Sequence, residues 1–169
     1  KSYRTLTVQV LPIPTPRTDL SAMPLVSCDI NNPNDGYEVF DLTTNAAYIA
    51  NGDLNVTLHY YPSYAAAVAG TPELIPATAA NVNQNVWIRV ESNYFIDYHG
   101  EHCYVLVEQP ITVNPLPLIT PNVVYQECDD DTDGFTVFDL TSQAANLLST
   151  NPLPLSNYTL AFYLNGTPE

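Results

Sequence analysis

Basic residues are scarce in this sequence. Only four of its 169 residues are lysine or arginine, against 18 aspartates and glutamates, and the formal net charge is −14. Such an acidic surface repels a nucleic-acid backbone and an anionic membrane surface, so nucleic acid is excluded as a partner. Cations such as calcium are favoured instead.

Long apolar runs and catalytic motifs are missing as well. No apolar stretch approaches the roughly 20 residues that a membrane-spanning helix needs, and the chain does not open on a signal peptide, so we expect no membrane insertion and an internal piece of a longer protein. G-x-S-x-G, HExxH and phosphate-cradling glycine loops are missing, and only six glycines are present. The sequence therefore predicts that the chain is not an enzyme.

What the sequence does contain is an internal repeat. A Cys-Asp pair at Cys28 precedes the block DGYEVFDLT of residues 35–43, and a Cys-Asp pair at Cys128 precedes DGFTVFDLT of residues 133–141, so that Phe138 follows Phe40 by 98 residues. Two further matches keep the same order: residues 56–61 with 158–163, and residues 7–12 with 112–117. We infer three parts: the last strand of a preceding repeat plus a Pro-rich linker in residues 1–16, a complete repeat in 17–117, and the first half of the next in 118–169.

Short segments rich in β-branched and aromatic residues, separated by Pro, Gly, Asn and Asp, predict strands. They lie at residues 5–10, 39–41, 55–61, 85–91 and 103–107. Ala-rich segments at 43–50, 63–69 and 141–148 predict short helical turns. The predicted fold class is all-β: immunoglobulin-like β-sandwich modules in tandem, with one or two helical turns each. Alternating prolines in residues 11–16 and 115–121 predict stiff joints between the modules.

These features resemble the repeats of very large cell-surface adhesins of Bacteroidota, which include gliding-motility adhesins and proteins exported by the type 9 secretion system. The resemblance rests on the Cys-Asp approach to the FDLT block, the Tyr60-Tyr61 strand, residues 86–90 (VWIRV) and the late Cys103. It implies an extracellular, cell-surface location and a stiff stalk or filament that serves adhesion or gliding. The partners would be neighbouring repeats of the same protein, and surface glycans or proteins.

The second acidic turn has the spacing of a cation-binding loop. Asp129, Asp131 and Asp133 precede Gly134 in a D-x-D-x-D-G pattern, which points carboxylates at one hard cation. Calcium is the expected ion, with Asp139 as a further ligand, and a solvated turn without an ion is the alternative. The first copy keeps oxygen ligands with fewer charges and predicts a weaker site: Asp29, Asn31 and Asp35.

Three cysteines cannot all pair within the chain. Cys28 precedes the first core strand and Cys103 begins a late one, so we predict a Cys28–Cys103 disulfide inside the complete repeat, with free thiols as the alternative. Cys128 stands where Cys28 stands in the first copy. Its partner is expected after Glu169.

Three other hypotheses follow from single segments. His99 and His102 lie beside Cys103, and the three together suggest a zinc site. A disulfide at Cys103 would prevent zinc binding. An exposed aromatic platform would make the module a binder of carbohydrate or protein. A strand donated by residues 1–10 to a neighbouring subunit would make it a filament subunit. The aromatic candidates are Tyr60, Tyr61, Tyr64, Tyr94, Phe95 and Tyr98.

Overall fold

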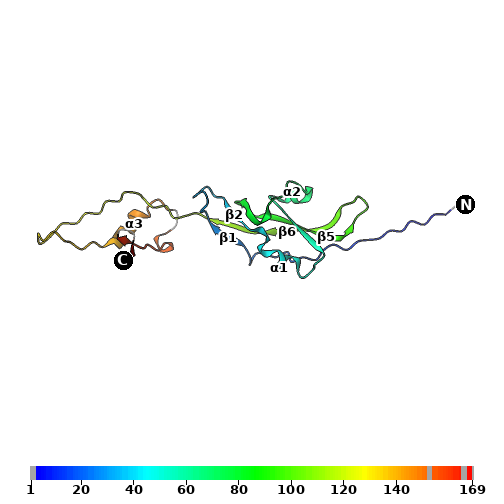
Figure 1. Ribbon diagram of the computed structural model, residues 1–169, viewed down its shortest axis with the longest axis horizontal. Helices are drawn as coiled ribbons and strands as arrows, with labels where there is room; N and C mark the ends of the chain where they lie inside the picture. Colours follow the sequence, from blue (N-terminus) through cyan, green and yellow to red (C-terminus); the bar gives the residue numbers. More distant parts are fainter. Residues whose placement is uncertain (1–2, 152–153, 165–166, 169) are drawn as a thin grey trace. The chain divides into compact units, whose positions relative to one another are not determined.

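The computed structural model describes residues 3–151, 154–164 and 167–168. The chain divides into two compact units, Lys1–Pro115 (unit 1) and Leu116–Glu169 (unit 2), both of which are seen in Figure 1. Among the described residues, no helix has the length and apolarity needed to cross a membrane.

Unit 1 is built mainly from short strands in three sheets. β3, β5 and β6 form an antiparallel sheet with β5 in the centre, β2 pairs with β4 antiparallel, and β1 pairs with β7 parallel. The strands are β1 (Leu25–Cys28), β2 (Glu38–Phe40), β3 (Val56–Tyr61), β4 (Ala80–Val82), β5 (Val86–Ile96), β6 (His102–Gln109) and β7 (Ile111–Asn114). The helical segments are η1 (Leu42–Asn45), α1 (Ala46–Ala50), α2 (Tyr64–Ala69) and η2 (Ala77–Ala79).

The hydrophobic core lies between the β2–β4 pair and the β3–β5–β6 sheet. Phe40 and Val82 face Ile88 and Val107 across it, and Ile88 is fully buried in the central strand. Because strands with alternating or continuous apolar residues must bury at least one face, this two-layer packing follows from the pattern of the sequence. The predicted all-β, sandwich-like fold is confirmed.

The other face of the β3–β5–β6 sheet is covered by α2. Tyr61, on β3, is buried against Ala66 and Ala67 of α2, and Trp87 packs beside them. The Ser63 hydroxyl caps α2 by accepting from the backbone N–H of Ala66. The alternation of β3 and β5 therefore fills two apolar layers, one on each side of the sheet.

Residues 5–10, predicted as a strand, are extended but unpaired. Within the described part of the chain they have no strand partner, and Leu6, Val8 and Val10 are 79–91% exposed. A strand needs a neighbour to satisfy its backbone hydrogen bonds, and the rest of unit 1 supplies none. This agrees with a strand that belongs to a preceding repeat or is donated to a neighbouring subunit, and which of the two holds stays open.

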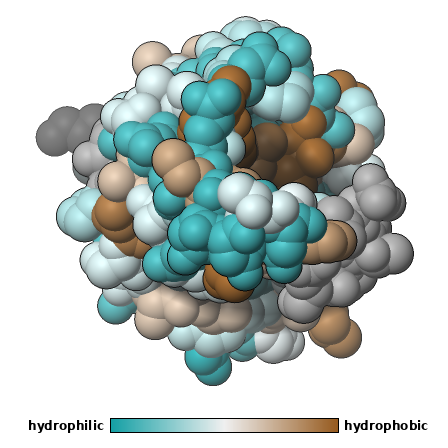
Figure 2. Space-filling view, turned by 90° about the vertical axis from the view of Figure 1, so that its left-hand side faces the viewer, coloured by the Kyte–Doolittle hydropathy of each residue, from teal (hydrophilic) through white to brown (hydrophobic). Residues whose placement is uncertain are grey.

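Unit 2 has less regular structure. It contains η3 (Leu140–Gln143), α3 (Ala144–Leu147), η4 (Leu155–Asn157) and one hairpin of β8 (Tyr163–Leu164) with β9 (Thr167–Pro168). An apolar hollow of about 320 Å³ lies among Ala144, Leu148, Tyr158 and Phe162. On the face drawn in Figure 2, brown apolar surface is likewise recessed between hydrophilic surfaces. The described residues of unit 2 supply no second layer to cover its apolar side chains.

Candidate functional site

The chain enters and leaves unit 1 at opposite ends. At the exit end, Cys28 closes β1 and is paired with Asn114, the last residue of β7. At the entry end, the backbone N–H of Asn93 donates to the Asn55 carbonyl at 2.8 Å, where β3 begins and β5 nears its turn. Cys103 lies here too, at the start of β6. Each end of unit 1 therefore carries one cysteine.

The disulfide predicted between Cys28 and Cys103 is not formed, and all three cysteines are free thiols. β7 follows β6 along the chain after a single residue. Cys103 precedes Asn114, the partner of Cys28, by 11 residues. At about 3.3 Å per extended residue, the two thiols are on the order of 35 Å apart. A disulfide requires Cα atoms within about 7 Å.

The segment that enters unit 1 is clamped to α1. The Arg17 backbone N–H donates to the Ile49 carbonyl at 3.0 Å, and the Asn51 side-chain amide donates to the Thr15 carbonyl at 3.2 Å. The Arg17 guanidinium donates back to Asn51 Oδ1 at 3.0 Å and lies 4.4 Å from the centre of the Tyr48 ring. Asn51 ends α1 in the left-handed conformation, with φ 53°, which directs its side chain toward the entering segment.

Unit 2 repeats this clamp with different residues. The Thr120 backbone N–H donates to the Leu147 carbonyl at 2.8 Å. Asn151 takes the role of Asn51: its amide donates to the Leu118 carbonyl at 2.5 Å, and its oxygen accepts from the Leu118 N–H at 2.8 Å. Two units with one clamp in common indicate that a fixed entry segment is a property of the module.

In the second acidic loop, three predicted ligands lie together. One carboxylate oxygen from each of Asp129, Asp131 and Asp133 lies within 4.8 Å of the others, and all three side chains are exposed. Asp129 also organises the loop, since its two oxygens accept from the backbone N–H groups of Thr132 and Gly134 at 2.8 Å. Hydrogen bonds, that from Gly134 foremost, lower the pKa of Asp129.

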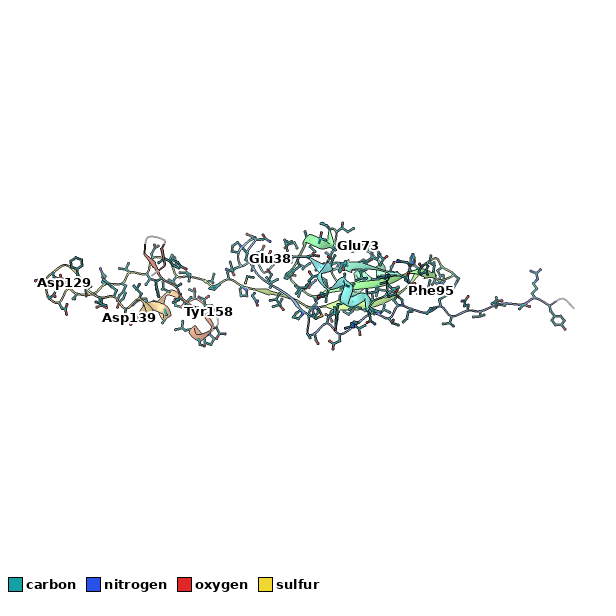
Figure 3. The ribbon with its side chains drawn as sticks, turned by 60° about the horizontal axis from the view of Figure 1, so that its bottom comes forward. Glu38, Glu73, Phe95, Asp129, Asp139 and Tyr158 are labelled. Atoms are coloured by element: carbon teal, nitrogen blue, oxygen red, sulfur yellow. The ribbon has the colours of Figure 1, made fainter. Side chains whose placement is uncertain are left out.

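Asp139, the fourth predicted ligand, has another role. Its Oδ1 accepts from the backbone N–H of Thr141 at 3.0 Å and from the Thr141 hydroxyl at 2.5 Å, which caps η3. The Thr141 hydroxyl is the main reason that the pKa of Asp139 is lowered. Figure 3 shows Asp139 well away from Asp129, so the loop and the cap are separate features.

The first acidic loop is held by a residue that the sequence analysis did not single out. Glu38 is buried and accepts from the backbone N–H of Ile30 at 2.8 Å, and from both the backbone and the side-chain amide of Asn31. Asp29 is also buried, with one oxygen accepting from Gly36 and the other without a hydrogen-bond partner among the described residues. Asp35 accepts from Tyr37. The three predicted ligands are thus separately engaged.

A comparison of the two copies could have indicated Glu38. The equivalent position in the second block is Thr136, whose shorter side chain reaches only the Cys128 carbonyl, at 3.4 Å, while Asp129 accepts from the loop backbone. The extra two residues between Cys28 and Gly36, relative to the second copy, require an additional anchor. Glu38 provides that anchor.

The histidines beside Cys103 point to separate partners. His99 contacts Asp97 at 3.3 Å in the exposed turn, whereas His102 contacts the Ser92 carbonyl at 2.7 Å. The Asp129, Asp131 and Asp133 group is the one metal-type cluster found in the described part of the chain. No zinc site follows from the arrangement around Cys103.

The aromatic candidates do not form one platform. Tyr60 and Tyr61 are buried, and burial, followed by the charge of Asp41, raises the pKa of Tyr60 to about 12. Tyr64 is 56% exposed and meets the Trp87 ring edge-to-face at 4.9 Å. The remaining three are exposed around the β5–β6 turn at the entry end, where Figure 3 labels Phe95: Tyr94, Phe95 and Tyr98.

These features define an all-β module with a cysteine at each end, acidic turns and a clamped entry segment. The chain matches the Flavobacterium inter-domain disulphide bond domain family twice, over residues 24–117 and 124–168, and it belongs to this family. The family agrees with the resemblance to proteins of Bacteroidota. No curated protein and no solved structure matches the chain.

Proposed function

We propose that this chain is part of a stiff tandem-repeat stalk outside the cell, in which disulfide bonds join consecutive modules. The observation that carries the proposal is the placement of Cys28 at the exit end of unit 1 and Cys103 at its entry end. When modules follow one another along a chain, the exit end of each precedes the entry end of the next. A cysteine of each kind is then available at every joint.

The pairing follows from this order. Cys28 bonds the counterpart of Cys103 in the following repeat, Cys128 does the same one repeat later, and Cys103 bonds the counterpart of Cys28 in the preceding repeat. With repeat spacings of 98 to 105 residues, the counterpart of Cys103 in unit 2 follows Glu169. The family's name, which refers to an inter-domain disulphide bond, supports this assignment.

The short linker supports the same assignment. Only three residues separate Asn114, at the end of β7, from Leu118, which is bound by Asn151. Four extended residues span about 14 Å at most, so the linker limits how far Leu118 can lie from Asn114. Prolines at 115 and 117 restrict that linker further.

Disulfide bonds of this kind persist in oxidising surroundings, which favours an extracellular location. The resemblance to Bacteroidota adhesins adds adhesion or gliding as the purpose of the stalk and the type 9 secretion system as its export route. Residues 7–9 correspond to Thr112–Asn114 of β7. In this arrangement they pair with the β1 strand of the preceding repeat, which explains why they have no partner in unit 1.

A tandem chain in which residues 15–117 occur twice tests the proposal, because it recreates one natural joint. After oxidation, non-reducing peptide mapping is expected to link Cys28 of the first copy to Cys103 of the second, with the two outer cysteines free. Cys28→Ser in the first copy should abolish that link, and Cys28→Ser in the second should leave it intact. A bond within one copy, or four free thiols, would overturn the proposal.

A further inference from the structure

A shallow depression on unit 1 brings together the sole tryptophan of the chain and several amide and carboxylate side chains. It has a volume of about 440 Å³, within the range of small-molecule sites. It lies beside the N-terminal end of α2 and is remote in sequence from both acidic loops. Its lining residues are Pro62, Ser63, Tyr64, Gln84, Asn85, Trp87 and Glu108.

The aromatic part of the depression is a corner of two rings. The Tyr64 and Trp87 rings are 4.9 Å apart and nearly perpendicular, at 82°. Tyr64 is 56% exposed. It is not needed to pack α2 against the sheet, because Ala66 and Ala67 make the buried contacts of that helix. The corner therefore offers apolar ring surface to a ligand from solvent.

The polar part is fixed by the fold. Glu108 stands directly opposite Trp87 in the β5–β6 pairing. Asn85 donates to Glu108 Oε1 at 2.9 Å while its own oxygen accepts from the Ile111 N–H at 3.0 Å, and Gln84 donates to the Pro62 carbonyl at 3.1 Å. Within the described residues, Glu108 Oε2 keeps its accepting capacity for a ligand hydroxyl.

We propose that this depression binds a neutral sugar ring of a glycan, stacked on the Tyr64–Trp87 corner and hydrogen-bonded by Glu108 and Gln84. A pyranose has an apolar C–H face and equatorial hydroxyls, which match aromatic rings bordered by carboxylate and amide groups. The lining contains no cationic side chain, and the chain carries a net charge of −14. Anionic sugars are therefore disfavoured. This activity goes beyond the stalk function and does not depend on the disulfide pairing.

The single tryptophan makes the test direct, because tryptophan emission from the whole chain reports on this depression alone. The 169-residue chain is titrated with cellotriose, maltotriose, mannotriose and xylotriose, and with sialyllactose as the anionic probe. We expect a saturable change of emission with at least one neutral trisaccharide and none with sialyllactose. Unchanged emission with all four neutral sugars would overturn the proposal.

Three variants locate the binding. Tyr64→Ala and Glu108→Gln are each expected to weaken binding about tenfold, the effect of losing about 1.4 kcal/mol. Tyr98→Ala removes an exposed tyrosine at the entry end and should leave the affinity unchanged. Circular dichroism establishes that each variant is folded. Equal affinities in the folded wild type, Tyr64→Ala and Glu108→Gln would place the sugar elsewhere and contradict the assignment.

Discussion

The carboxylate of Glu38 reaches back across the first acidic loop to the backbone N–H of Ile30, 2.8 Å away. This hydrogen bond, with the one from the Val39 N–H, outweighs burial and lowers the pKa of Glu38 below its ordinary value of 4.5. The folded chain thus holds Glu38 ionised more firmly than the unfolded chain does. The resulting stabilisation is complete above about pH 4.5 and is lost as the pH falls through the folded-state pKa.

Replacement of Glu38 by Gln is therefore expected to lower the thermal stability of unit 1 at neutral pH and to flatten its decline in acid. Melting curves from pH 7 to pH 3, followed by Trp87 fluorescence, measure both effects. Asp130→Asn is the control, because Asp130 is an exposed carboxylate in unit 2. A Glu38→Gln variant with the same pH dependence as the wild type would show that the loop does not depend on this charge.

The clamp at the entry end gives a second prediction. Asn51→Gly removes the side-chain amide while glycine still adopts the left-handed backbone at φ 53°. The loss of hydrogen bonds to Thr15 and Arg17 should lower the free energy of unfolding by about 1 kcal/mol. Hydrogen exchange at Arg17 should accelerate, and Asn83→Ala, an exposed change at the turn before β5, should not alter it. Unchanged exchange at Arg17 would mean that the segment is held by other contacts.

The central strand should be the most sensitive element of unit 1. Ile88 is fully buried in the core, so Ile88→Ala should lower the free energy of unfolding by roughly 2 to 5 kcal/mol. Tyr94 lies near the end of the same strand and is 70% exposed, so Tyr94→Ala should change the free energy of unfolding by less than about 0.5 kcal/mol. Chemical denaturation followed by circular dichroism compares the two, and similar losses would contradict the two-layer core.

Calcium binding by the second acidic loop stays a prediction. Calorimetric titration of the 169-residue chain should show calcium uptake that is lost in the Asp131→Asn, Asp133→Asn double variant. Asp139→Asn should retain it, because Asp139 caps η3 instead of joining the three clustered carboxylates. Absence of a binding signal from the wild-type chain would mean that the loop is a solvated turn, held by the hydrogen bonds that its own aspartates accept.

Short-range patterns in the sequence were reliable guides to the fold, and long-range placement was not. Aromatic and β-branched runs predicted β3, β5 and β6, and the Ala-rich segments predicted the helical turns of α1, α2 and α3. The same aspartate pattern fits a metal ligand and a helix cap equally well, so the sequence alone could not show that Asp139 caps η3. β1 and β4 were missed because each is short and stable only through its partner strand.

Cys28 and Cys103 show most clearly what could not be predicted from the sequence. Position in the chain indicates that Cys28 begins the module and Cys103 comes late, which is compatible with contact in many sandwiches. What separates them is the direction of β6 and β7, and direction depends on pairing across the whole unit. Similarly, the period-2 pattern could place Trp87 in the central strand, but not decide that its ring faces α2 and Tyr64.

The parallel pairing of β1 with β7 has a mechanical consequence. A pull on the two ends of unit 1 draws β1 toward the entry end and β7 toward the exit end, along the strand axes. The hydrogen bonds from Leu25–Ile111 to Cys28–Asn114 are then loaded in shear and must yield together, whereas an antiparallel hairpin pulled at its open end unzips one bond at a time. Tension along a chain of such modules meets its resistance in this four-residue ladder.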